Sequence, residues 1–144
     1  MSVGTRTGAS EHRRDSTMAL RGAMPKLTLV YPKMRALAEP ARLTAAHAKL
    51  AIENVFPWDY KPFEGKPWPR ARAGTTFGQL PMLVVEDGAK TTKICMSNSI
   101  CRYLAGLGGT LPADPADAAV MDSIGERFHE LFAPLNPICN FKVR

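Results

Sequence analysis

The sequence predicts an α/β fold in which a βαβ unit is followed by a β-hairpin, a helix and one further helix. Two observations carry this prediction. Two short runs rich in apolar and β-branched residues, 27–31 and 80–85, lie on either side of a segment with helical periodicity. Prolines and glycines then divide the chain into pieces of strand or helix length.

The βαβ unit is predicted from the first of these runs onward. Residues 27–31 alternate in the manner of a strand, and Pro32 ends it. A helix is expected to open at Glu39-Pro40, because proline suits the first helical turn. Its apolar stripe is predicted to be Leu43, Ala46, His47 and Leu50. A second strand is expected over 52–56.

The ββα unit follows a loop over 57–76, with one helical turn near 68–72. The dense apolar run 80–85 predicts a buried strand, 86–88 a turn, and 91–96 the returning strand. Ser97 is predicted to cap a helix that ends at Gly108-Gly109. The stripe of that helix is predicted to be Ile100, Tyr103, Leu104 and Leu107.

A last helix is expected from Ala116, with Pro134 and Pro137 ending it. Its apolar face comprises Val120, Ile124, Phe128 and Leu131. We predict three regions: an N-terminal extension over 1–24, a domain over 25–108, and a linker with one helix over 109–144. A βαβ unit followed by a hairpin and a helix is typical of a thioredoxin-like sandwich.

Charge and composition exclude several function classes. The net charge of +6 is spread among acidic residues, without a dense basic run or a nucleic-acid motif. The mild positive bias instead suits small anionic ligands, and nucleic acid is not expected as a partner. The longest apolar run is too short to span a membrane. The three cysteines, Cys95, Cys101 and Cys139, form neither a disulfide framework nor a metal pattern, which favours a reducing cytoplasm.

Residues 1–24 are rich in Ser, Thr, Gly and Arg and have no apolar period. They lack the apolar core of a secretory signal. Two interpretations stay open: an organelle transit peptide, which Glu11 and Asp15 disfavour, or a disordered extension ahead of a start at Met24.

Three segments, "LTLVYPKMRALAEPARL", "WPRARAGTTFGQLPML" and "MSNSICRYLA", carry a family resemblance. In this order and spacing they resemble the N-terminal domain of the cytosolic glutathione transferases, closest to the sigma class. The resemblance runs from Pro25 to about Leu131. It implies a thioredoxin-like domain followed by the first helix of an all-α domain, cut short at its C-terminal side.

The resemblance implies that Tyr31 is the catalytic residue. A free thiol titrates near about 8.5, so little of it is thiolate at neutral pH. A phenol that donates a hydrogen bond to the sulfur favours the thiolate, which then attacks an electrophilic carbon. The alternative is a strand tyrosine with a purely structural hydroxyl.

The resemblance also implies residues that hold glutathione. Leu80 would offer its backbone to the cysteinyl part of the tripeptide, next to a cis-proline at Pro81. Ser97 would receive the γ-glutamyl carboxylate at a helix N-terminus. The implied glutathione contacts are Trp68, Arg72, Gln79, Leu80, Pro81, Met96 and Ser97. Glu130 would reach the glutathione of a dimer partner.

Four departures from the family pattern stand against this resemblance, one of which is a longer loop between Val55 and Trp68. Ala36-Leu37 replace the usual Gly-Arg, and Arg35 is a nearby cation that could substitute in part. Met96 replaces the usual glutamine. The helices that build the pocket for a hydrophobic co-substrate are missing, which leaves the last helix with few partners within the chain.

The leading hypothesis is a cytoplasmic, homodimeric glutathione S-transferase that joins glutathione to a small hydrophobic electrophile. Glutathione is then a substrate, and neither a cofactor nor a metal is implied. A peroxidase or isomerase that uses the same thiolate stays open. The second hypothesis is an impaired binding or interaction module. A thiol oxidoreductase is disfavoured because Tyr31-Pro32-Lys33-Met34 stands where a redox cysteine would begin the first helix.

Overall fold

We describe a computed structural model of the chain over residues 23–135. The predicted N-terminal extension lies outside the described residues apart from its last two, as do Pro137 and Cys139. Among the described helices, none combines the length and the apolar character needed to cross a bilayer.

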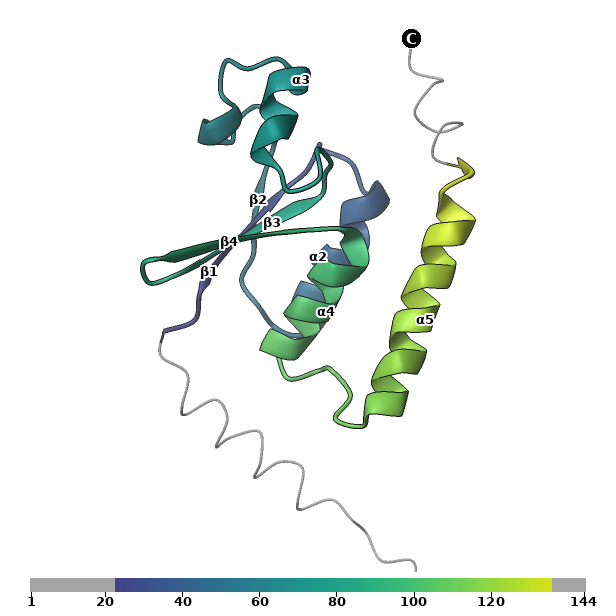
Figure 1. Ribbon diagram of the computed structural model, residues 1–144. Coiled ribbons are helices and arrows are strands. Elements are labelled where there is room, and N and C mark those ends of the chain that lie inside the picture. Colours follow the sequence, from purple (N-terminus) through teal and green to yellow (C-terminus); the bar gives the residue numbers. More distant parts are fainter. Residues whose placement is uncertain (1–22, 136–144) are drawn as a thin grey trace, which may run out of the picture.

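A four-stranded mixed sheet forms the centre of the fold, in the order β2-β1-β3-β4 (Figure 1). The strands are β1 (Lys26–Val30), β2 (Glu53–Val55), β3 (Met82–Asp87) and β4 (Lys90–Cys95). β1 pairs with β2 in parallel and with β3 antiparallel, and β3 pairs antiparallel with β4. Because β1 and β2 are parallel, a crossover helix must join them. The predicted βαβ-ββα order is confirmed.

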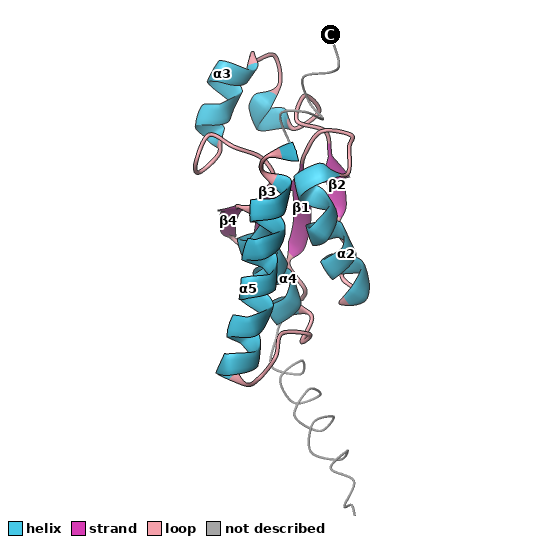
Figure 2. Cartoon of the chain, turned by 90° about the vertical axis from the view of Figure 1, so that its right-hand side faces the viewer, coloured by secondary structure: helices cyan, strands magenta, loops and turns pink. Residues whose placement is uncertain are grey.

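Helices α2 (Glu39–His47) and α4 (Ser97–Leu107) cover one face of the sheet (Figures 1 and 2). The alternation of side chains along β1 and β3 sends Leu27, Leu29 and Leu83 to this face, where they pack against Ile100 and Leu104 of α4. The stripe predicted for α4 is therefore confirmed: Ile100 and Leu104 are fully buried, and Tyr103 and Leu107 pack at the edge of the cluster.

The opposite face is covered by the segment between β2 and β3. It contains the 3₁₀ helices η2 (Lys61–Phe63) and η3 (Arg72–Gly74) and the short helix α3 (Trp68–Ala71). Phe63 and Ala71 of this segment pack against Val30, Met82 and Val84 of the sheet. The expected helical turn near 68–72 is confirmed as α3, but the prediction of a single turn is wrong, because η2 and η3 add two 3₁₀ turns and the segment forms a second small core.

The stripe predicted for α2 is wrong for Leu43, Ala46 and His47, which are exposed, whereas Leu50, just after the helix, packs against the core. Leu43 is 63% exposed, whereas Ala38, Ala41 and Ala45 are fully buried. The reason is the close approach of α2 and α4, which leaves room only for small side chains between them. At the end of α4, a Cβ added to Gly108 would lie 2.4 Å from the Cβ of Ala48, so no larger residue fits there without a shift.

The last helix, α5 (Pro115–Phe132), begins one residue before the predicted start and is capped by Asp114, whose carboxylate accepts from the N–H groups of Ala116 and Asp117. It lies beside α4 on the side away from the sheet (Figures 1 and 2). Its predicted apolar face is exposed, with Val120, Ile124, Phe128 and Leu131 each between 45% and 66% accessible. The expectation that this face has few partners holds over the described residues.

Candidate functional site

Strand register gathers most of the predicted site residues at one end of the sheet. Val30, at the end of β1, lies opposite Met82 at the start of β3, and Met82 lies opposite Cys95 at the end of β4. Tyr31 follows Val30, Pro81 precedes Met82, and Met96 follows Cys95. The antiparallel pairing therefore brings Tyr31, the Leu80-Pro81 bond and the start of α4 together.

Tyr31 lies just beyond β1 and continues its ladder, since its N–H donates to the carbonyl of Val55 (3.1 Å). Its phenol oxygen accepts a hydrogen bond from the Leu37 N–H at 3.4 Å. Burial raises the pKa of the Tyr31 phenol above its ordinary value, while the Leu37 N–H and the charge of Arg42 act to lower it. The hydroxyl thus stays protonated at neutral pH, and none of the described residues accepts its proton.

The Leu80-Pro81 peptide bond is cis, as predicted. Pro81 is buried, Leu80 is half-buried against the second core, and Gln79 is exposed. The preceding Gly78 has a φ of +69°, a conformation that favours glycine. The loop therefore enters β3 through a glycine-permitted turn and a cis-proline.

The prediction that Ser97 caps α4 is wrong. Ser97 is the first residue of the helix, and its side chain does not cap it. Met96 occupies the capping position with a φ of +73° and makes no side-chain hydrogen bond there. The Ser97 hydroxyl is buried and donates to the carbonyl of Leu37 at 2.8 Å. The predicted carboxylate site is therefore the N-terminus of α4, where no capping side chain of the described residues accepts from the first backbone N–H groups.

Trp68 and Arg72 approach from the other side of the sheet. Trp68 packs edge-on against Phe63, with ring centroids 6.3 Å apart, and joins the second core. Arg72 is exposed, and its guanidinium lies over Gly78: a Cβ built there would be 3.3 Å from Arg72 Nε. The predicted cation therefore lies beside the loop that leads into the cis-proline.

The acidic residues of α5 have local partners. Glu130 forms an ion pair with Arg127 within the same helix (2.7 Å). Asp122 pairs with Arg102 of α4, and Glu126 accepts from Asn98 Nδ2 at 2.8 Å. Asp122 and Glu126 thus join two helices. The prediction that Glu130 reaches a dimer partner stays a prediction.

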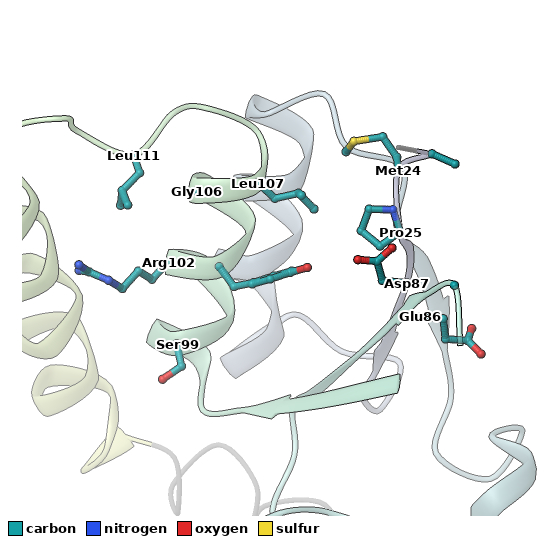
Figure 3. A pocket seen from close by; sticks show the side chains of 12 residues that line it. Met24, Pro25, Glu86, Asp87, Ser99, Arg102, Gly106, Leu107 and Leu111 are labelled. Atoms are coloured by element: carbon teal, nitrogen blue, oxygen red, sulfur yellow. The ribbon is translucent and has the colours of Figure 1, made fainter. Parts of the chain in front are cut away.

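A pocket of ≈ 940 Å³ lies at the opposite end of the sheet from Tyr31 (Figure 3). Its walls come from the chain before β1, the β3–β4 hairpin and the outer side of α4, with Met24, Asp87 and Leu111 among the lining residues. None of the predicted site residues lines it. It is a separate feature from the candidate site.

The cysteines of the described residues are free thiols. Cys95 is buried in the second core. Cys101 is half-buried, and burial raises the pKa of its thiol. Within residues 23–135 there is also no cluster of three or more His, Cys, Asp or Glu side chains that could hold a metal ion.

Sequence reasoning missed two functional candidates, Leu37 and Arg42. In the sequence, Leu37 was considered only because it replaces the arginine of the family pattern. In the structure, its backbone forms hydrogen bonds with both Tyr31 and Ser97. A backbone contact leaves no trace in residue type, so no sequence signal could have found it. Arg42 lies in the helix predicted from Glu39-Pro40 onward, outside its predicted apolar stripe, so the sequence shows it only as a surface charge.

Comparison with known proteins places this chain among glutathione S-transferases. It is 32% identical over 114 residues to glutathione S-transferase 1 of Ascaris suum, covering 79% of this chain and 50% of the relative. It is 36% identical over 107 residues to the hematopoietic prostaglandin D synthase of Gallus gallus, covering 72% and 49%. A search of protein-family models found no match.

Comparison with solved structures also finds glutathione S-transferases. A Nu-class glutathione S-transferase from Haemonchus contortus matches with a TM-score of 0.61 and 32% identity, over 79% of this chain and 51% of that one. The sheet order, the two covering helices and the cis-proline define the class of thioredoxin-like domains. Within that class, the chain belongs to the glutathione S-transferase family. It spans about half the length of the curated relatives it matches.

Proposed function

We propose that this chain binds glutathione as a substrate and activates its thiol for transfer to a small electrophile. The observation that carries the proposal is the Tyr31 hydroxyl, which accepts the Leu37 N–H and keeps its own proton to donate. It lies at the end of the sheet where the cis-proline and the start of α4 also meet.

The chemistry follows from these contacts. Because the pKa of Tyr31 is raised, the phenol is a neutral donor near pH 7 and not a competing anion. A hydrogen bond from this donor to the glutathione sulfur favours the thiolate and lowers the pKa of the thiol. The thiolate is the nucleophile that forms the new carbon–sulfur bond while the leaving group departs with its electron pair.

The same region offers groups that suit the rest of the tripeptide. At the start of α4, backbone N–H groups and the helix dipole favour a carboxylate. Since the Ser97 proton already goes to Leu37, we propose that backbone N–H groups supply most of this contact. Arg72 would pair with the second carboxylate, Leu80 would offer its backbone, and the remaining wall would come from Trp68, Gln79, Pro81 and Met96.

The decisive experiment compares conjugation rates of the protein and of Tyr31→Phe. We expect a loss of roughly tenfold or more, which corresponds to about 1.4 kcal/mol of transition-state stabilisation. Tyr60→Phe is the matched control, because Tyr60 is also a partly buried phenol but belongs to the second core. Equal rates for the protein and Tyr31→Phe would end the catalytic proposal.

A binding module is the second candidate function, and Leu37 and Met96 favour it because they replace polar residues of the family pattern. Retention on immobilised glutathione without conjugation would support it. One relative is named a prostaglandin D synthase, so an isomerisation that uses the same thiolate is a third assay to run on the same variants.

The assembly and location of the protein belong to the same proposal. We propose a cytoplasmic homodimer in which Glu130 contacts the glutathione of the partner. Free thiols at Cys95 and Cys101 suit a reducing compartment. Light scattering at several concentrations tests the dimer, and a monomer at all of them would remove Glu130 from the site.

A further inference from the structure

The loop between β1 and α2, residues 32–38, connects two parts of the candidate site through the backbone of one residue, Leu37. The Leu37 N–H donates to the Tyr31 phenol (3.4 Å), and the Leu37 carbonyl accepts from the Ser97 hydroxyl (2.8 Å). The position of the Leu37 backbone therefore decides whether the phenol oxygen has a hydrogen-bond donor.

This loop does not hold its shape by local preference alone. Ala36 has a φ of +37°, in the left-handed region that residues with a Cβ disfavour. The 3₁₀ helix η1 (Ala36–Ala38) that carries Leu37 has no side-chain cap. A loop with an unfavourable residue and no cap persists only if surrounding contacts hold it.

Arg42 of α2 supplies such contacts. Its Nη1 donates to the carbonyl of Met34 (2.9 Å) within the loop and to Glu39 Oε2 (3.1 Å) at the start of α2. Its Nε donates to Asn54 Oδ1 (2.8 Å) on β2. One guanidinium thus ties the loop to the helix that follows it and to the neighbouring strand, which the fixed fork of arginine permits and a lysine ammonium does not.

We infer that Arg42 is a positioning residue for Tyr31: its three hydrogen bonds hold loop 32–38 so that the Leu37 N–H points at the phenol oxygen. The inference rests on the proposed role of Tyr31 and extends it to a residue that touches neither the phenol nor a substrate. A donor at the phenol oxygen polarises the hydroxyl and makes its proton a stronger donor to an anion.

Charge and positioning have to be separated, because the Arg42 charge also acts to lower the pKa of the phenol. Arg42→Lys retains the charge but cannot make the three directed bonds. Arg42→Met removes both. Arg127→Met is the matched control, since Arg127 lies on the exposed side of α5 with a single ion-pair partner in its own helix.

The experiment titrates the Tyr31 phenol without glutathione. The near-ultraviolet phenolate absorbance of each protein is compared with that of the same protein carrying Tyr31→Phe, which subtracts Tyr60 and Tyr103. Since the Leu37 N–H lowers the pKa of the phenol, losing it moves the midpoint to higher pH. We expect this in Arg42→Lys and, more strongly, in Arg42→Met, with Arg127→Met unchanged.

A wild-type midpoint in Arg42→Lys would overturn the inference, because charge alone would then account for the effect of Arg42. Circular dichroism across the titrated range checks that each variant is folded, and if Arg42→Met is not, Arg42→Lys decides. The readout is independent of catalysis: if Tyr31→Phe keeps the full conjugation rate, the proposed function fails while the titration still tests Arg42.

Discussion

Helices α4 and α5 are neighbours with opposite relations to the rest of the protein. Both carry an apolar stripe that the sequence shows clearly. The stripe of α4 lies against the sheet, where Ile100 and Leu104 have no exposed surface. The stripe of α5 is exposed, and Ala118, which lies outside that stripe, is the only buried residue of this helix. An apolar period therefore predicts a helix, but it does not determine which face of the helix packs against the rest of the protein.

The contacts between the two helices explain the orientation of α5. Arg102 pairs with Asp122, and Asn98 donates to Glu126, so polar side chains lie at the junction. Gly125 allows close approach, since a Cβ there would lie 3.1 Å from Asn98 Oδ1. These partly exposed contacts are individually weak, so α5 is expected to be held less firmly than α4.

The largest expected difference comes from shortening one leucine on each helix. Leu104→Ala leaves a cavity in the core and should cost about 2–5 kcal/mol of unfolding free energy. Leu131→Ala, at a 60% exposed position of α5, should change it by less than about 0.5 kcal/mol. Urea unfolding followed by circular dichroism measures both, and equal losses would contradict the comparison.

The second prediction tests how tightly α4 packs at its end. Gly108→Ala would place a methyl group 2.4 Å from the Cβ of Ala48 and should destabilise the protein by about 1–3 kcal/mol. Gly106→Ala is the control, because its nearest neighbour is Leu111 Cδ2 at 3.9 Å. There we expect stabilisation of up to about 1 kcal/mol from helix propensity. Thermal unfolding that moves both variants in the same direction would rule out the close contact.

The third prediction loosens α5 from α4. Asp122→Ala removes a half-exposed ion pair and should cost about 0.2–1 kcal/mol, an effect that shrinks as salt is added. Hydrogen exchange should quicken for amides of α5 and stay unchanged in β1. Glu130→Ala, which breaks an ion pair inside α5 only, serves as the comparison. Faster exchange in the sheet as well would show that α5 and the sandwich unfold together.

The smallest effect is expected on the exposed stripe. Ile124→Gln replaces a 66% exposed side chain with a good helix former and should alter the unfolding free energy by less than about 0.5 kcal/mol. It should also reduce the fluorescence of a dye that binds apolar surfaces. A large destabilisation would mean that Ile124 packs against part of the protein in solution.

Much of the fold was predictable because it rests on local patterns. The strands around Leu29 and Leu83, the turn at Gly88 and the end of α4 at Gly108 each follow from residue type and neighbours, whereas the cis bond before Pro81 was implied by the family resemblance. The site was predictable in part. Tyr31 and Pro81 were placed at the same end of the sheet by the family resemblance, and the register has them there.

The failures share one cause, which is that they depend on contacts between distant segments. α2 turns Ala41 and Ala45 inward and exposes Leu43 because α4 lies close to it. Ser97 lies inside the first turn of α4, where its hydroxyl donates to the carbonyl of Leu37, sixty positions earlier in the chain, and Met96 takes the capping position.

The amino-acid sequence by itself determined the order of strands and helices, the apolar period of each and the breaks between them, since these depend on residues only a few positions apart. Tertiary structure decided which face of α2 is buried and which face of α5 is exposed. It also decided that the Leu37 N–H donates to the Tyr31 phenol and that Arg42 binds the loop carrying Leu37. Those outcomes depend on the distances between elements and on backbone groups that every residue carries, which no residue-type pattern records.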